Sequence, residues 1–250
     1  MIYFTEFKKH LKSMIIFSLI LAIVLVFFIF NTKNNVPALD DAFKSLPKAI
    51  QFILGYSAFD ETTLLGNFLN IYSYALLAII IYMLVLSTAI SYKGNKLSII
   101  DISPISSYKA LAYKFLAIIT NCLIVLISTL FTSGIFLLIA GEKNIYYLFY
   151  ILYNAIPMII LISTIGILIG RIPLNYNYLL VIIIILSIGI YLIYYVTLDK
   201  NNLIYNFFIL RGTINLDIIN HKLNSLNALF SILMAIILFT INLLFTKKSN

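Results

Sequence analysis

The side chains that could carry chemistry in this chain are few and far apart. The two histidines, His10 and His221, stand near opposite ends of the sequence, and Cys122 is the only cysteine. There is no G-x-x-x-x-G-K-S/T phosphate loop, no H-E-x-x-H zinc motif and no G-x-S-x-G nucleophile motif. One cysteine excludes a disulfide framework. We therefore predict no catalytic, cofactor-binding or metal site in this chain, and no enzymatic activity of its own.

Apolar residues dominate the rest of the sequence. Of its 250 residues, 62% are hydrophobic and only 10% are charged, and the mean hydropathy is +1.06. Soluble domains are about 45–50% apolar and about 25% charged. The apolar runs are continuous, whereas strands of a membrane barrel alternate apolar and polar residues. The composition therefore predicts an all-α, polytopic membrane protein.

Six apolar runs are long enough to cross a bilayer, which takes about 20 residues. We expect one transmembrane domain, residues 1–250, with six transmembrane helices. The first run is too long for a signal peptide and no cleavage pattern follows it, so we expect it to be retained. The predicted spans are Met14–Phe30, Asn70–Ile90, Phe115–Ile139, Tyr146–Gly170, Tyr178–Val196 and Leu226–Phe245.

The distribution of charge predicts the orientation. Six crossings put both termini on one side, and that side carries many basic residues but only Glu6 and Asp101 as acids. Because basic residues concentrate in cytoplasmic segments, both termini are expected in the cytoplasm. The basic residues of the predicted cytoplasmic side are Lys8, Lys9, Lys12, Lys93, Lys96, Lys109, Lys114, Arg171, Lys247 and Lys248.

Abundant isoleucine, asparagine, lysine and tyrosine suit an AT-rich bacterial genome, which favours a bacterial plasma membrane.

Two longer segments are expected on the outer side. Residues 31–69 should hold short helices on the membrane surface, one beginning at Pro37 and a second at Pro47. Residues 197–225 are too apolar for open solvent, so a dip partway into the outer leaflet is expected.

The N-terminal residues 2–13 have the pattern of an interfacial helix. Phe4, Phe7 and Leu11 recur at helical spacing, while Lys8 and Lys12 (with Lys9) project elsewhere. An apolar face at the acyl boundary and lysines at anionic headgroups would hold such a helix flat on the inner leaflet. The alternative is an ordinary basic flank of the first span.

The polar residues inside the predicted spans are uncharged. Asp and Glu are absent from all six, which disfavours ion-coupled transport because such transport usually needs buried ionisable groups. Asn121, Asn154 and Asn242 could bond between helices or line a path. Gly166 and Gly170 form a small-residue face for helix packing, within the subunit or across a dimer.

The segment Ser91–Lys114 is the main polar segment expected on the cytoplasmic side. Ile99, Ile100 and Ile102 are apolar although this segment should face water, and Pro104 fixes the chain direction after them. Exposed apolar side chains beside charges often mark a partner site. The isoleucines could instead lie against the bilayer.

The layout resembles the six-span membrane subunit of ABC-2-type ABC transporters (type V exporters). The match is most specific in the segment 91–114, where Gly94, Pro104, Ser106 and Lys114 stand as in the family. The family's acidic residue after span two is absent, where Tyr92-Lys93 stands, and its arginine is absent, where Ser107 stands. The resemblance implies a coupling loop that docks on a separate ATPase. That loop comprises Gly94, Ile99, Ile100, Ile102, Pro104, Ser106 and Lys114.

The same resemblance implies the partners and the activity. Two permease subunits, identical or paralogous, would pair, and each would contact a cytoplasmic ATPase that binds ATP and Mg²⁺. The short outer loops favour export, and the expected cargo is an amphipathic or antimicrobial peptide, as for phenol-soluble-modulin exporters. Export of lipids or hydrophobic drugs, and a non-transporting anchor or sensor subunit, remain alternatives. No nucleic-acid partner is expected.

Overall fold

The chain is all α-helical in the part that the computed structural model describes, namely residues 2–45, 47, 64–92, 106–143, 145–197 and 225–247. The helices in this part vary from 22 to 43 residues in length. They are α1 (Ile2–Lys44), α3 (Leu64–Ser91), α4 (Ser107–Ala140), α5 (Tyr147–Ile169), α6 (Tyr176–Thr197) and α8 (Ser225–Lys247).

Five of these helices, α1, α3, α4, α5 and α8, contain stretches long and apolar enough to cross a membrane. The described apolar stretch of α6, Tyr176–Ile190, is shorter than the stretches in these five helices. Within hydrocarbon the backbone must satisfy its own hydrogen bonds, which is why such sequences form long helices. The chain is therefore a polytopic helical membrane protein, and a sixth span in α6 stays a prediction.

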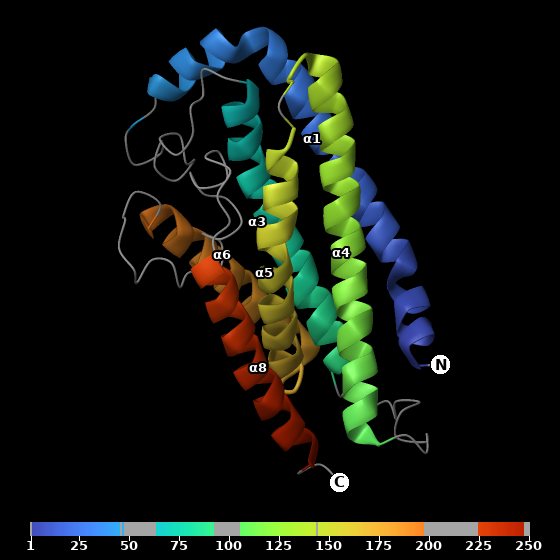
Figure 1. The fold of residues 1–250 in the computed structure, drawn as a ribbon. Helices are drawn as coiled ribbons and strands as arrows, with labels where there is room; N and C mark the ends of the chain where they lie inside the picture. The colour runs from blue at the N-terminus through green and yellow to red at the C-terminus, as the bar shows by residue number, and fades with distance from the viewer. Residues whose placement is uncertain are drawn as a thin grey trace.

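The long helices run up and down in a bundle whose two termini lie toward the same end (Figure 1). We call this the basic end. It comprises the start of α1, Tyr92 after α3, the first turns of α4, the α5–α6 connection and the last turns of α8. The described side chains there include Lys109, Lys114 and Arg171.

The helices α3 and α5 form the centre of the bundle. They pack against each other, while α1 lies chiefly on α4, α6 on α3 and α8 on α5. Buried side chains line this centre, among them Phe68, Tyr72, Ile79 and Ile159. The outward faces of α1 and α8 are apolar and exposed, as expected for helix surfaces that contact lipid rather than water.

The helix α4 illustrates how local chemistry sets an end. Gly141 follows it with φ 101°, the left-handed region that costs a glycine little. Its N–H bonds to the carbonyl of Leu138 at 3.0 Å, and the N–H of Glu142 bonds to that of Leu137 at 3.0 Å. These bonds satisfy carbonyls that a helix end leaves without partners.

The first helix is longer than the sequence suggested. The expectation that Pro37 begins a new helix is wrong, because α1 continues through it to Lys44. A proline within a helix removes one N–H bond and bends the axis without having to end the helix. The last turns of α1 lean across the end opposite the basic end (Figure 1). The second expected outer helix, after Pro47, and residues 198–224 lie outside the described residues.

The expected interfacial segment, residues 2–13, also belongs to α1. The helix passes from residue 13 to residue 14 without interruption, and the apolar stretch of α1 is Tyr3–Lys33. A segment lying flat on a membrane would need a turn before the span, and α1 contains no break there. How residues 2–13 sit relative to the bilayer stays a prediction.

Candidate coupling site at the basic end of the bundle

The proposed coupling loop is described at its two flanks. Gly94, Ile99, Ile100, Ile102 and Pro104 lie outside the described residues. On one side of them α3 ends at Ser91, and on the other α4 begins at Ser107. The segment is joined to the bundle at these two helix ends, so the contacts of the helix ends define the candidate site.

Lys114 links the two flanks. Its Nζ donates a hydrogen bond to the carbonyl oxygen of Ile90 at 3.0 Å. Ile90 lies in the last turn of α3, where carbonyls have no partner further along the helix. A basic side chain there satisfies such a carbonyl, and its positive charge is attracted to the negative end of the helix dipole. The start of α4 is thus held to the end of α3.

Ser106 occupies the N-cap position of α4. Its backbone is extended (ψ 140°), and its carbonyl accepts the N–H of Ala110 at 3.1 Å. Its side chain is exposed and makes no capping hydrogen bond. The structure therefore shows Ser106 setting the start of α4 through its backbone, with its hydroxyl facing outward.

Gly166 and Gly170 face α3 within the same chain. A Cβ on Gly166 would lie 2.5 Å from the Cβ of Ser87, and one on Gly170 would lie 2.7 Å from the carbonyl oxygen of Thr88 and collide with Ser91 Oγ. Real Cβ contacts are never so short, so only glycine fits at either position. Thr88 Oγ1 also donates to the carbonyl of Gly166 at 3.1 Å.

Two serines of α3 make this close approach feasible. Ser87 Oγ bonds to the carbonyl of Met83 at 2.6 Å, and Ser91 Oγ bonds to that of Ser87 at 2.7 Å. Each hydroxyl is satisfied within its own helix, so α3 presents small side chains to the glycines of α5. Small residues at such a contact let two membrane helices pack closely.

Arg171 and Asn242 connect α5 to α8. Asn242 Nδ2 donates to the carbonyls of Leu238 at 3.0 Å and of Thr164 at 3.3 Å. Arg171 Nη1 donates to the carbonyl oxygen of Asn242. Partial burial lowers the pKa of Arg171 from its usual value, although a guanidinium stays charged at any physiological pH. The sequence left two roles open for Asn242, and the bond from its side chain to Thr164 is the interhelical one.

The other two candidate path residues lie on different helices and at different heights. Asn121 is near the middle of α4, is buried and donates to Ala117 of its own helix at 2.9 Å. Asn154 is buried in the first half of α5, the half farther from the basic end. Neither of its side-chain polar atoms has a hydrogen-bond partner among the described residues. The structure does not bring the three asparagines together into one site.

The N-terminal candidates surround a contact between α1 and α4. Tyr3 donates through its hydroxyl to Thr120 Oγ1 at 3.1 Å, and its ring stacks on Phe7 with centroids 6.1 Å apart. Phe4 is exposed, as are Lys8 and Lys12, while Phe7 and Leu11 are half-buried. The apolar stripe therefore divides between packing on the bundle and facing outward. Tyr3 was not part of the apolar stripe that the sequence predicted.

Several contacts of the basic end could not be anticipated from single residues. Tyr92 and Tyr176 bring their ring centroids within 5.5 Å and connect the end of α3 to the start of α6. Thr88, Ser91 and Arg171 also act between helices. The position of Arg171 just after an apolar span marked it as a basic residue of the cytoplasmic side. Its partner on α8 could not be read from the sequence, because that contact depends on the tertiary fold.

Within the described ranges, no three or more His, Cys, Asp or Glu side chains gather where they could hold a metal ion. The fold and these contacts define a helical membrane protein whose helix ends are linked at one end. Comparisons of the chain with protein-family models, with curated proteins and with solved structures returned no match.

Proposed function

We propose that this chain is the membrane-spanning subunit of an ATP-driven ABC exporter. In this proposal a cytoplasmic ATPase binds ATP and Mg²⁺ and docks on the segment 91–114. A second permease copy or paralogue completes the transporter. The ATPase moves the helices, and this chain supplies the route across the bacterial plasma membrane.

The observation that carries the proposal is the continuous set of contacts at the basic end. Lys114 links α4 to α3, the glycines of α5 lie against α3, and Arg171 links α5 to α8. A displacement of the segment between α3 and α4 would therefore be passed to four helices. A loop that only joined two independent spans would not need such contacts.

Charge supports the orientation that the proposal requires. At the basic end the described basic side chains include Lys109, Lys114 and Arg171. The first turns of α1 add Lys8, Lys9 and Lys12, with Glu6 as their one acid. Toward the opposite end the described charged side chains include the bases Lys33, Lys44 and Lys143 and the acids Asp41 and Glu142. The first pattern is typical of cytoplasmic segments, where an ATPase would have access.

For the cargo we propose an amphipathic peptide. The bundle interior is aliphatic with a few buried polar groups, among them Tyr72 and Asn154. Such an interior suits a molecule with one apolar face and some hydrogen-bonding capacity. Lipids and hydrophobic drugs share the apolar requirement, so a transport assay must compare all three classes.

The proposal is tested by site-specific cross-linking. Because Cys122 is the only cysteine and is buried, Cys122→Ala provides a cysteine-free background. In that background Ile100→Cys probes the proposed docking segment and Lys143→Cys probes the opposite end. We expect Ile100→Cys to cross-link in native membranes to a protein that hydrolyses ATP, and Lys143→Cys to form no such product. The absence of an ATPase product at position 100, or its appearance at position 143, would contradict the proposal.

A further inference from the structure

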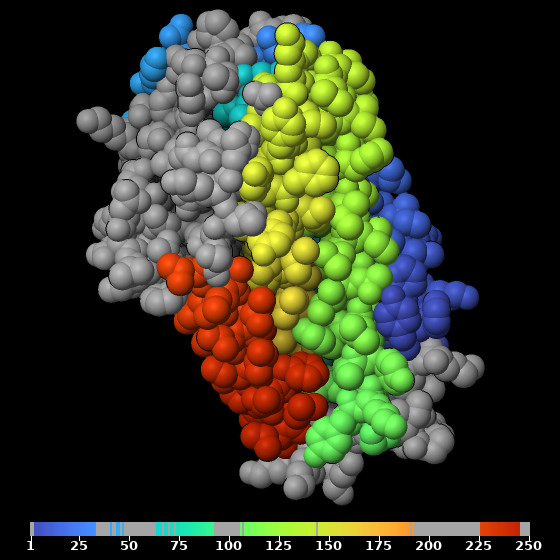
Figure 2. Space-filling view, viewed as in Figure 1, coloured from blue at the N-terminus to red at the C-terminus, as the bar shows by residue number. Residues whose placement is uncertain are grey.

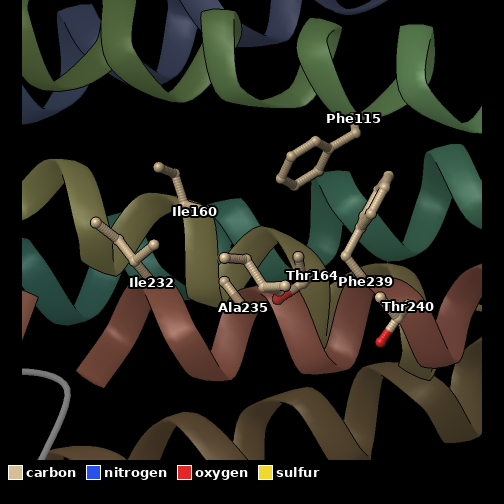
Figure 3. A pocket seen from close by; sticks show the side chains of 8 residues that line it. Phe115, Ile160, Thr164, Ile232, Ala235, Phe239 and Thr240 are labelled. Carbon is tan, nitrogen blue, oxygen red and sulfur yellow. The ribbon is translucent and has the colours of Figure 1, made fainter. Parts of the chain in front are cut away.

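An apolar groove opens on the surface where α4, α5 and α8 meet. Its volume is about 170 Å³, and Figure 3 shows Phe115 of α4 and Phe239 of α8 pointing toward each other across it. The two ring centroids are 5.0 Å apart. The lining residues are Phe115, Ile160, Thr164, Ile232, Ala235, Ile236, Phe239 and Thr240.

The two threonines do not make the groove polar. Thr164 Oγ1 bonds to the carbonyl of Leu161 at 2.7 Å, and Thr240 Oγ1 bonds to that of Ile237 at 2.7 Å. Both hydroxyls are satisfied within their own helices. The groove therefore offers hydrocarbon contacts and no free hydrogen-bonding group of its own, which suits an alkyl chain.

The groove faces outward on the membrane-exposed side of the bundle. Ile232 and Ile236 on its α8 side are 41% and 55% exposed. Figure 2 shows the surface of α8 (red) beside those of α5 (yellow) and α4 (green), the face on which the groove lies. Its occupant must therefore come from the bilayer or from a neighbouring molecule within it.

One end of the groove points toward the basic end of the bundle, where two cations lie. Asn242 donates to the carbonyl of Thr164 in the groove wall, and its own carbonyl oxygen accepts a hydrogen bond from Arg171. Lys114 precedes Phe115 in α4, and its ammonium group bonds to Ile90 of α3. Among the acidic side chains that are described, Asp41 and Glu142 belong to the opposite end of the bundle and Glu6 to α1. The groove thus has an apolar wall, and two cations lie beyond the end of it that is nearest the basic end of the bundle.

Size limits what can enter the groove. A cavity of about 150 Å³ lined by Leu, Ile and Phe accommodates one benzene molecule. An α-helix is about 10–12 Å across with its side chains, so a peptide helix or a helix of a second copy would lie over the groove and not enter it. A segment of a single acyl chain fits these dimensions.

We propose that the groove binds an anionic phospholipid. One acyl chain lies along Phe115, Ile236 and Phe239, and the headgroup phosphate lies near Lys114 and Arg171. The attraction between basic side chains and anionic lipid provides selectivity over zwitterionic lipid. This site requires only that the basic end faces an anionic leaflet, so it stands whether or not the chain is an exporter.

The absence of tryptophan from the sequence allows a direct test. Single-tryptophan variants are reconstituted in phosphatidylcholine bilayers that contain brominated phosphatidylglycerol or brominated phosphatidylcholine, which quench tryptophan on contact. Ile236→Trp reports on the groove, and Ile232→Trp gives a second groove position. Leu233→Trp, at an exposed position of α8 outside the groove, is the matched control.

We expect the Ile236→Trp variant to be quenched with about fivefold preference for phosphatidylglycerol, the size of effect that one nearby basic residue provides. The control should show a ratio close to one. Adding Lys114→Gln and Arg171→Gln, singly or together, should lower the preference toward the control ratio, whereas Lys143→Gln should leave it unchanged.

Three results would overturn the site. One is the same lipid ratio at positions 236 and 233. Another is no quenching by either lipid at positions 232 and 236, which would mean that protein or cargo covers the groove. The third is a phosphatidylglycerol preference that survives removal of both cations. If the charge variants fail to fold, the comparison of the two groove positions with position 233 still decides the question.

Discussion

The ammonium group of Lys114, in the second turn of α4, donates a hydrogen bond to the carbonyl oxygen of Ile90, in the last turn of α3, at 3.0 Å. This bond spans the two helix ends that flank the proposed docking segment. A helix end without such a partner would leave its carbonyls to lipid headgroups or water. The bond therefore makes α3 and α4 respond together to any movement of the chain between them.

Removal of this donor should loosen the basic end. Lys114→Met keeps a side chain of similar length but leaves the Ile90 carbonyl without its donor. Hydrogen bonds to charged groups contribute about 1.5–3 kcal/mol when well shielded, and partial exposure reduces this, so we expect about 1 kcal/mol. Thermal unfolding in detergent should show a Tm lower by a few degrees.

Lys109 provides the control for that measurement, because it lies on the same part of α4 and is exposed. Lys109→Met should leave Tm nearly unchanged. Equal losses from both substitutions would mean that charge near the helix start, and not the bond to Ile90, sets stability there.

The contact between Gly170 and α3 should be intolerant of one added methyl group. Gly170→Ala would force α5 away from Ser91 and Thr88, at a cost of about 1–3 kcal/mol for overpacking. Gly189 of α6 is the matched control, since nothing lies within 4 Å of a Cβ placed there. Gly189→Ala should be neutral or stabilising by about 0.5–1 kcal/mol, because alanine is the better helix former. If Gly170→Ala unfolds at the same temperature as Gly189→Ala, α3 and α5 do not pack as described.

The hydrogen bond from Asn242 to Thr164 should hold α8 on α5. Asn242→Leu preserves the approximate volume and removes the donor, and interhelical bonds in membranes contribute about 0.6–2 kcal/mol. We expect a lower Tm and easier proteolytic release of α8. Thr240→Val serves as the comparison, because the Thr240 hydroxyl bonds to its own helix. An unchanged Asn242→Leu protein would show that apolar packing alone holds α8.

The predicted orientation can be tested in whole cells with a membrane-impermeant maleimide. In the Cys122→Ala background, Lys143→Cys should be labelled in intact cells, because it lies beyond α4 at the end opposite the basic end. Lys109→Cys should be labelled only after the cells are permeabilised. The reverse pattern would place the proposed docking segment outside the cell and remove the basis for the exporter proposal.

Hydropathy predicted several elements closely, because the physical requirement that creates a membrane helix is visible in the sequence. The expected spans Tyr146–Gly170 and Leu226–Phe245 correspond to α5 (Tyr147–Ile169) and α8 (Ser225–Lys247). The end of α1 was not predicted, because Pro37 has the local signature of a helix start and only the folded chain shows it inside a helix.

The candidate site was less accessible to sequence reasoning. The spacing of Gly166 and Gly170 indicates a close contact but does not name the partner, and the choice of α3 over a second copy depends on where Ser87 and Ser91 lie. The groove between α4, α5 and α8 likewise results from packing. Phe115 and Phe239 are far apart in sequence and each resembles an ordinary residue of an apolar span.

The central claim, that a separate ATPase drives this chain through the segment 91–114, is tested most directly by ATP hydrolysis in the purified complex. The wild-type chain and an Ile100→Glu variant are isolated from native membranes, and vanadate-sensitive hydrolysis is measured with and without an amphipathic helical peptide. We predict that the wild-type preparation contains an ATPase stimulated by the peptide. The variant should keep its Tm and lose the ATPase. Equal hydrolysis in both preparations, or none in the wild type, would contradict the account.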